Sequence, residues 1–195
     1  MSAFEMPKWQ DLLKKAIQKN RRDAHNRYIQ LATLSETGKP RVRMVVFRGF
    51  SETTSALFII TDSRSRKIQE LQSCSEVEVG WYFTQSREQF RLQCDATLHT
   101  SESDRGAHRD RIWQALSDSA RAQFFWKEPG APLGVGSELN VSANPPDTFV
   151  VVELAPDHVD HLILAKRQLR TISTLTEVGW QEMPVNPEDD RSPTR

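Results

Sequence analysis

Alternating hydrophobic and polar positions run through most of the chain and predict a protein built mainly from β-strands. The clearest case is 88–100, where every second side chain from Phe90 to Leu98 is apolar and those between them are polar. Successive side chains on a strand point to opposite faces, so this stretch predicts an antiparallel strand with one buried side. Further strands are expected at 28–34, 41–49, 56–61, 76–83, 148–155 and 158–166, the last two separated at Pro156, and a closing hairpin within 171–183.

Helical spacing of apolar residues is confined to a few segments. Residues 7–20 predict an amphipathic helix, 65–73 a short helix, and 102–126 a helical insertion in two pieces. The few helices and the short links between strands favour an antiparallel barrel or closed sheet with flanking helices over a Rossmann fold. The apolar face of the first helix carries Trp9, Leu12, Leu13, Ala16 and Ile17.

Length and composition predict one globular domain over residues 1–195, with a Pro-rich loop at 127–147 and a polar tail at 186–195. The absence of net charge argues against nucleic acid as a partner. No apolar run is long enough to span a membrane, and the first residues lack the apolar block of a signal peptide. Cys74 and Cys94 are too few for a disulfide framework, so we expect reduced thiols and a cytoplasmic protein.

Positive charge is concentrated between residues 41 and 67. This stretch holds six basic residues and only two acidic ones, although the whole chain has no net charge. Arginine beside valine, isoleucine and phenylalanine is costly unless an anion meets it. We therefore expect a phosphate-binding surface along the sheet. The basic residues are Arg41, Arg43, Arg48, Arg64, Arg66 and Lys67.

The segment 61–67, TDSRSRK, is the sharpest local signal, because a strand ends there and a short helix begins near Ser65. Free backbone N–H groups and the helix dipole favour an anion at such a point. Arg66 and Lys67 add positive charge, while Thr61 and Ser65 add hydroxyl donors. The alternative is an ordinary capped helix, but basic residues in its first turn oppose the helix dipole, and a bound anion removes that conflict.

Arg43 and Arg48 lie on the predicted second strand, roughly 16 Å apart along an extended chain. One of them could hold a phosphate while the other reaches a ring system at the far end of the same ligand. Strict alternation puts them on opposite faces, so this interpretation requires a bend, for which Gly49 is a suitable place. The alternative is a pair of solvent-facing arginines on an edge strand.

Three motifs, in this order and spacing, resemble the FMN-binding pattern of the pyridoxamine 5'-phosphate oxidase-like split-barrel proteins. They are RVRMVVFRGF (41–50), TDSRSRK (61–67) and WYFTQSREQFRL (81–92). The resemblance covers most of the chain and implies an antiparallel split β-barrel, a homodimer, and FMN held at the dimer interface.

The resemblance also assigns roles to residues. It implies that 43–48 line the FMN, with Arg43 toward the phosphate, and that Thr61, Arg66 and Lys67 contact the phosphate and ribityl chain. Gln89 matches a glutamine beside the flavin ring, whose alternating carbonyl and N–H groups suit an amide; alone it would be a surface glutamine. No catalytic side chain is implied. The expected cofactor-binding residues are Arg43, Met44, Val45, Val46, Arg48, Thr61, Ser65, Arg66, Lys67 and Gln89.

The part of the pattern that binds substrate is missing. The oxidases of this family carry a tyrosine, an arginine and a serine that hold the substrate phosphate, whereas the corresponding stretch here offers Phe124 and Glu128. Of their C-terminal Arg-Leu-His-Asp-Arg signature, only the arginines have counterparts here, Arg167 and Arg170, and the histidine and the aspartate are missing. We therefore expect an FMN-dependent oxidoreductase acting on a different small molecule.

Two other functions compete with this one. The protein could be an FMN-binding carrier or sensor without turnover, which reduction of the flavin by NAD(P)H or a substrate would exclude. It could also bind nucleic acid through the basic stretch, but few aromatic residues are interleaved with the arginines. No metal site is expected, since His158 and His161 lack further ligands nearby in the sequence.

Overall fold

The structure, a computed structural model, describes residues 5–104, 107–130 and 142–187. Within them lie the strands β1 (Tyr28–Leu34), β2 (Pro40–Val46), β3 (Gly49–Phe50), β4 (Leu57–Asp62), β5 (Glu76–Phe83), β6 (Glu88–His99), β7 (Phe149–Ile163), β8 (Leu169–Thr176) and β9 (Gly179–Val185). The helices are α1 (Lys8–Lys19), α2 (Arg66–Ser73), α3 (His108–Gln114) and α4 (Asp118–Ala122), with two 3-10 turns, η1 (Ala24–Arg27) and η2 (Gln123–Phe125).

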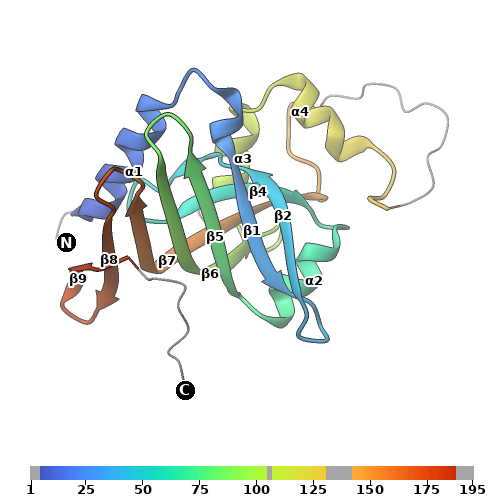
Figure 1. Ribbon diagram of the computed structural model, residues 1–195. Helices are drawn as coiled ribbons and strands as arrows, with labels where there is room; N and C mark the ends of the chain where they lie inside the picture. Colours follow the sequence, from blue (N-terminus) through green and yellow to red (C-terminus); the bar gives the residue numbers. More distant parts are fainter. Residues whose placement is uncertain (1–4, 105–106, 131–141, 188–195) are drawn as a thin grey trace.

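These strands form one antiparallel sheet in the order β2-β1-β5-β6-β7-β4-β3, with β8 added to β7 and β9 to β8 (Figure 1). The predicted antiparallel split barrel with flanking helices is confirmed, and the alternative of a closed sheet is wrong. Phe47 and Arg48 link the two edges, because the Phe47 amide donates to Arg27 O and the Arg48 amide to Phe58 O at 2.8 Å. The sheet thus curves round on itself. Its end strands β2 and β3 do not pair with each other among the described residues, so the sheet stays open.

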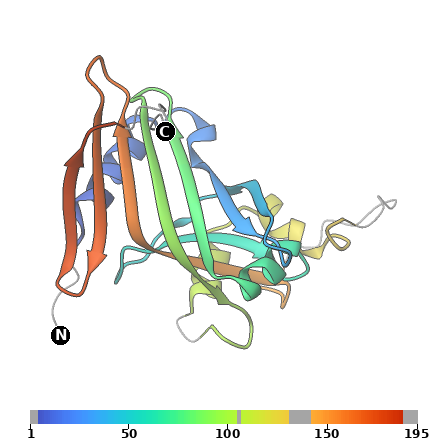
Figure 2. The same cartoon turned by 60° about the horizontal axis from the view of Figure 1, so that its bottom comes forward.

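The main core lies between α1 and the inner faces of β1, β5 and β6. Trp9, Leu13 and Ala16 of α1 are buried in it, as the spacing of residues 7–20 predicts. The ring of Trp9 packs against Trp180 at 5.4 Å, so the helix also contacts the β8–β9 hairpin, beside which it lies in Figure 2. The strands contribute Ile29, Leu31, Val77, Val79, Trp81, Phe83, Phe90, Leu92 and Cys94.

A second cluster of buried side chains joins α3 and η2 to the other end of the sheet. Trp113 of α3 packs against Phe124 of η2 at 5.8 Å and against Phe149 of β7 at 4.9 Å. This cluster fixes the position of the segment that follows α4.

The expected Pro-rich loop at 127–147 and polar tail at 186–195 fall largely outside the described residues.

The prediction of two strands separated at Pro156 is wrong, because β7 runs unbroken through this proline. Its register with β6 shifts there: Cys94 pairs with Pro156, whereas Gln93 pairs with His158. Asp157 is therefore an extra residue, as in a β-bulge. Proline has no N–H to donate to a neighbouring strand, and a bulge lets the strand continue past it.

Within the described part of the chain, no helix has the length and apolar character needed to cross a membrane.

Candidate functional site

A cavity of about 420 Å³ lies between the β2–β4 side of the sheet and the segment following α4. One wall is polar and basic and comes from β4, the turn after it and the first turn of α2. The facing wall comes from α4, η2 and the residues beyond it, and it carries the aromatic rings of Phe124 and Trp126. The lining residues predicted from the sequence are Met44, Val45, Val46, Arg48, Thr61, Ser65 and Lys67.

A second cavity, of about 500 Å³, adjoins the first. Ser65 and Lys67 line both, so the N-terminal turn of α2 separates them. Arg43 and Arg66 line this second cavity, together with Arg41. The basic stretch predicted to bind phosphate is thus brought together around the start of α2.

Lys67 is half-buried, and its ammonium group contacts two hydroxyl groups. Its Nζ donates to Thr61 Oγ1 and to Ser65 Oγ, each at 2.8 Å. Burial lowers the pKa of Lys67, and the nearby positive charge of Arg43 lowers it further. Ser65 occupies the N-cap position of α2, yet its side chain makes no capping hydrogen bond there. This arrangement favours an anion site over the ordinary capped helix.

Arg43 is engaged by protein groups instead. Its Nη2 forms an ion pair with Glu70 of α2, and its Nη1 donates to Thr33 Oγ1 at 2.6 Å. Burial acts to raise the pKa of Glu70, but the hydrogen bond from Thr33 and the charge of Arg43 together lower it. Arg43 therefore holds α2 against the sheet, which differs from the phosphate contact that the resemblance implies.

Arg48 lies in the bend between β2 and β3, where Gly49 has a φ of 131°. The bend expected near Gly49 is therefore present, and it brings Arg48 into the cavity that Val45 and Val46 also line. Arg48 Nε is buried and has no hydrogen-bond partner among the described residues. Burial lowers the pKa of Arg48, and the charge of Arg27 adds to this effect. A buried unpaired donor of this kind calls for an acceptor from outside the chain.

Gln89 is separate from this group. It lines a different cavity, of about 280 Å³, beside Gln30, Tyr82 and Arg91. Gln89 pairs with Tyr82 across β5 and β6, on the outer face of the sheet. Within one chain, then, the structure does not bring Gln89 to the cavity that holds Arg48 and Lys67.

The aromatic wall was not predicted from the sequence. Phe124, Trp126 and Lys127 all line the cavity of Arg48 and Lys67. Arg64 holds this wall in place, because it pairs with Asp62 at 2.7 Å and donates to Trp126 O at 3.2 Å. The only sequence signal was the aromatic run that ends at Trp126, directly before a lysine.

Comparisons with known proteins bear on the family and the fold. Residues 6–100 match the family model of the pyridoxamine 5'-phosphate oxidase FMN-binding domain. Pyridoxine/pyridoxamine 5'-phosphate oxidase 2 of Arabidopsis thaliana is 35% identical over 191 residues, covering 92% of this chain and 96% of that protein.

Solved structures show the same likeness. A pyridoxamine 5'-phosphate oxidase-related, FMN-binding protein from Nostoc punctiforme is 36% identical, with a TM-score of 0.88 over 94% of this chain and 100% of that one. PhzG from Burkholderia lata, solved with tetrahydrophenazine-1-carboxylic acid, is 18% identical, with a TM-score of 0.76 over 96% of this chain and 100% of its own, and shares the fold alone.

The fold and the lining of the two cavities define a split-barrel protein that gathers cations and hydroxyl groups around the start of α2. Because the likeness to the Arabidopsis protein extends over nearly the whole of both chains, this chain belongs to the pyridoxamine 5'-phosphate oxidase FMN-binding family. The resemblance drawn from the three sequence motifs is thereby confirmed.

Proposed function

We propose that this protein binds FMN and acts as an FMN-dependent oxidoreductase on a small molecule. The observation that carries the proposal is the pair of half-buried cations, Arg48 and Lys67, that line one cavity. Neither forms an ion pair with any described residue, and burial lowers the pKa of both. Such groups are stabilised by an anionic ligand.

The residues present fit the parts of FMN. Lys67, Arg66 and the hydroxyls of Thr61 and Ser65 surround the start of α2, where backbone N–H groups also favour a phosphate. Arg48 would then donate to an acceptor of the ring system. When bound, FMN supplies the electron and hydride transfer, while the chain binds and orients it and shields it from water.

The site requires a second copy of the chain if Gln89 is to meet the flavin. Through the pairing of β2, β1, β5 and β6, Gln89 lies on the same outer face as Met44 and Val42. Figure 1 shows these four strands side by side, with no described helix across them. This face exposes large apolar side chains, which typically mark an interface. They are Tyr28, Leu34, Val42, Met44 and Tyr82.

A homodimer with FMN at its interface follows from this proposal. In light scattering we expect twice the chain mass of 22.4 kDa. Val42, which is 70% exposed, lies in the centre of β2, and Val42→Arg should produce monomers with reduced FMN content. The matched control is Val178→Arg, at an 86% exposed position in the β8–β9 turn, which should remain dimeric. A wild-type monomer that still holds FMN would contradict the shared site.

A carrier or sensor without turnover is the competing function. We expect NAD(P)H or a small organic substrate to bleach the flavin absorbance under anaerobic conditions and oxygen to restore it. Phe124, Trp126 and Lys127 support the presence of a substrate pocket. They give one side of the cavity an aromatic surface and a single positive charge, both of which a small organic molecule can contact. A flavin that no donor reduces, in protein with full FMN occupancy, would support the carrier.

The free thiols of Cys74 and Cys94 suit a reducing compartment such as the cytoplasm.

A further inference from the structure

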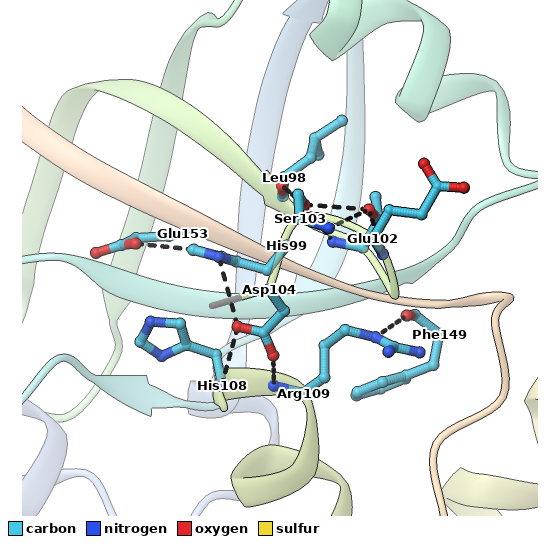
Figure 3. A network of polar contacts seen from close by, with 10 residues as sticks. Leu98, His99, Glu102, Ser103, Asp104, His108, Arg109, Phe149 and Glu153 are labelled. Carbon is cyan, nitrogen blue, oxygen red and sulfur yellow. Dashed lines mark hydrogen bonds and ion pairs between the residues drawn. The ribbon is translucent and has the colours of Figure 1, made fainter. Parts of the chain in front are cut away.

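A group of metal-type ligands lies at the end of β6, apart from the flavin-site residues. It consists of His99, the last residue of β6, Asp104 in the turn that follows, and His108, the first residue of α3 (Figure 3). Each offers one ligand atom, and these atoms all lie within 4.8 Å of one another. In tetrahedral zinc sites with bonds of about 2.0–2.1 Å, neighbouring ligand atoms are roughly 3.3 Å apart. Small side-chain rotations would therefore bring the three onto one ion.

The ring of His99 lies between two carboxylates. Its Nε2 is 2.9 Å from Glu153 Oε2 on β7, and its Nδ1 is 3.8 Å from Asp104 Oδ1. A neutral imidazole has one N–H, and donating it to Glu153 leaves a lone pair on Nδ1 facing the Asp104 oxygen. In this tautomer two acceptors face each other, and a cation between them would stabilise the pair. A carboxylate bonded to the far nitrogen of a metal-binding histidine is the usual outer contact in such sites.

His108 supplies a second unsatisfied ring. Its Nδ1 is buried and has no hydrogen-bond partner among the described residues. Its ring packs beside that of His99, 4.5 Å between centroids, and beside Phe58 at 5.1 Å. Buried polar atoms normally have partners, so an unpaired nitrogen here requires an explanation. Coordination to an ion would provide one.

Asp104 is held in position by the backbone. Its Oδ2 accepts from the amide of Arg109 at 2.7 Å, and its Oδ1 accepts from the amide of His108 at 3.2 Å. The guanidinium of Arg109 points elsewhere and donates to Phe149 O and Pro146 O. Figure 3 shows the carboxylate directed toward the histidines and the arginine side chain directed away. The Asp104 carboxylate is therefore held in place before any ion arrives.

We propose that His99, Asp104 and His108 bind a divalent transition-metal ion of the Zn²⁺ type, with Glu153 orienting His99. Two imidazoles and a carboxylate form the borderline donor set that suits Zn²⁺, Co²⁺ and Ni²⁺, whereas Ca²⁺ and Mg²⁺ prefer sites made of oxygen. Asp104 and Glu153 balance the charge of the ion. Bound metal ties α3 to the ends of β6 and β7. Since Trp113 of α3 packs on Phe124, the ion would also support the aromatic wall of the flavin cavity.

The test is a Zn²⁺ titration by calorimetry at pH 7.5, with protein that carries no polyhistidine tag. We expect one ion per chain. His108→Gln and Asp104→Asn should each weaken binding at least 100-fold, and Glu153→Gln by about 10- to 100-fold, as for other outer contacts. The matched control is His25→Gln, at an exposed position, which should bind like the wild type. Co²⁺ should give the visible absorption of a tetrahedral site in the wild type and the control only.

Circular dichroism separates loss of ligand from loss of fold. If His108→Gln does not fold, the near-isosteric Asp104→Asn decides the question, and NMR of the Co²⁺-loaded wild type should show exchangeable protons of two coordinated histidines. No binding to the wild type at 100 µM Zn²⁺ would overturn the proposal. Wild-type affinity in a folded Asp104→Asn variant, or ions held only at other histidines, would overturn it as well.

Discussion

Oxidation of pyridoxamine 5'-phosphate by the FMN-loaded protein is expected to be two to four orders of magnitude less efficient than by a dedicated oxidase. The reason is Glu128, which in the sequence stands near the position at which the family pattern has a phosphate-binding arginine. Losing one charged phosphate contact costs about 1.5–3 kcal/mol. A carboxylate within 4 Å of the phosphate adds about 1 kcal/mol of repulsion in water and more in a drier pocket.

Other cations are poorly placed to replace the missing arginine. Arg170 forms a two-point ion pair with Asp160, both contacts at 2.9 Å, which offsets its charge. Arg167 is exposed. Lys127 does line the cavity and is the one described cation of the aromatic wall that could meet a substrate anion.

Formation of pyridoxal 5'-phosphate measures this prediction. Glu128→Arg should raise kcat/KM at least tenfold, while Glu177→Arg, at an exposed position in the β8–β9 turn, should leave it unchanged. The Arabidopsis relative carries the name of such an oxidase, so the assay also decides whether this chain shares that substrate. Turnover comparable to that of a true oxidase would show that Lys127 or another group has replaced the missing residues.

Lys67→Ala and Arg66→Ala are each expected to weaken FMN binding about 10- to 150-fold, since a charge-assisted contact to phosphate contributes about 1.5–3 kcal/mol. The larger loss is expected for Lys67, because it is half-buried and has only neutral hydroxyls as partners. Lys19→Ala, at an exposed position in α1, is the matched control.

Fluorescence quenching of FMN, titrated with each variant, gives the affinities. Arg43→Ala separates the two kinds of arginine in this region. It removes the partner of Glu70, so it should lower thermal stability even without FMN, whereas Arg66→Ala should not. Full flavin occupancy in both Lys67→Ala and Arg66→Ala would show that the phosphate lies elsewhere.

Much of the fold could be predicted because the signals are local. The alternation in 88–100 and the apolar face of 7–20 each reflect one element packing against one core, and both elements form as expected. Pro156 misled the prediction, since the bulge that carries β7 past it depends on the register with β6. The helical insertion begins only at His108, after a turn in which Asp104 accepts two backbone amides.

The site was predictable in composition but not in arrangement. TDSRSRK identified the groups around the start of α2, because a strand end, hydroxyls and cations are adjacent in sequence. The pairing of Arg43 with Glu70 joins residues far apart in the chain, and no local pattern reveals it. The same holds for the contact of Arg64 with Trp126, which builds the aromatic wall. Gln89 matches the family motif, yet within one chain it lines a different cavity from Arg48 and Lys67.

The most direct test of the central claim compares FMN, riboflavin and FAD in calorimetry with the flavin-free protein. Arg66 and Lys67 surround the start of α2, where one terminal phosphate would lie, so FMN should bind at least 100-fold more tightly than riboflavin and more tightly than FAD. Chromophore released from freshly purified yellow protein should likewise be FMN. Equal affinity for FMN and riboflavin would contradict the phosphate site on which the proposed function depends.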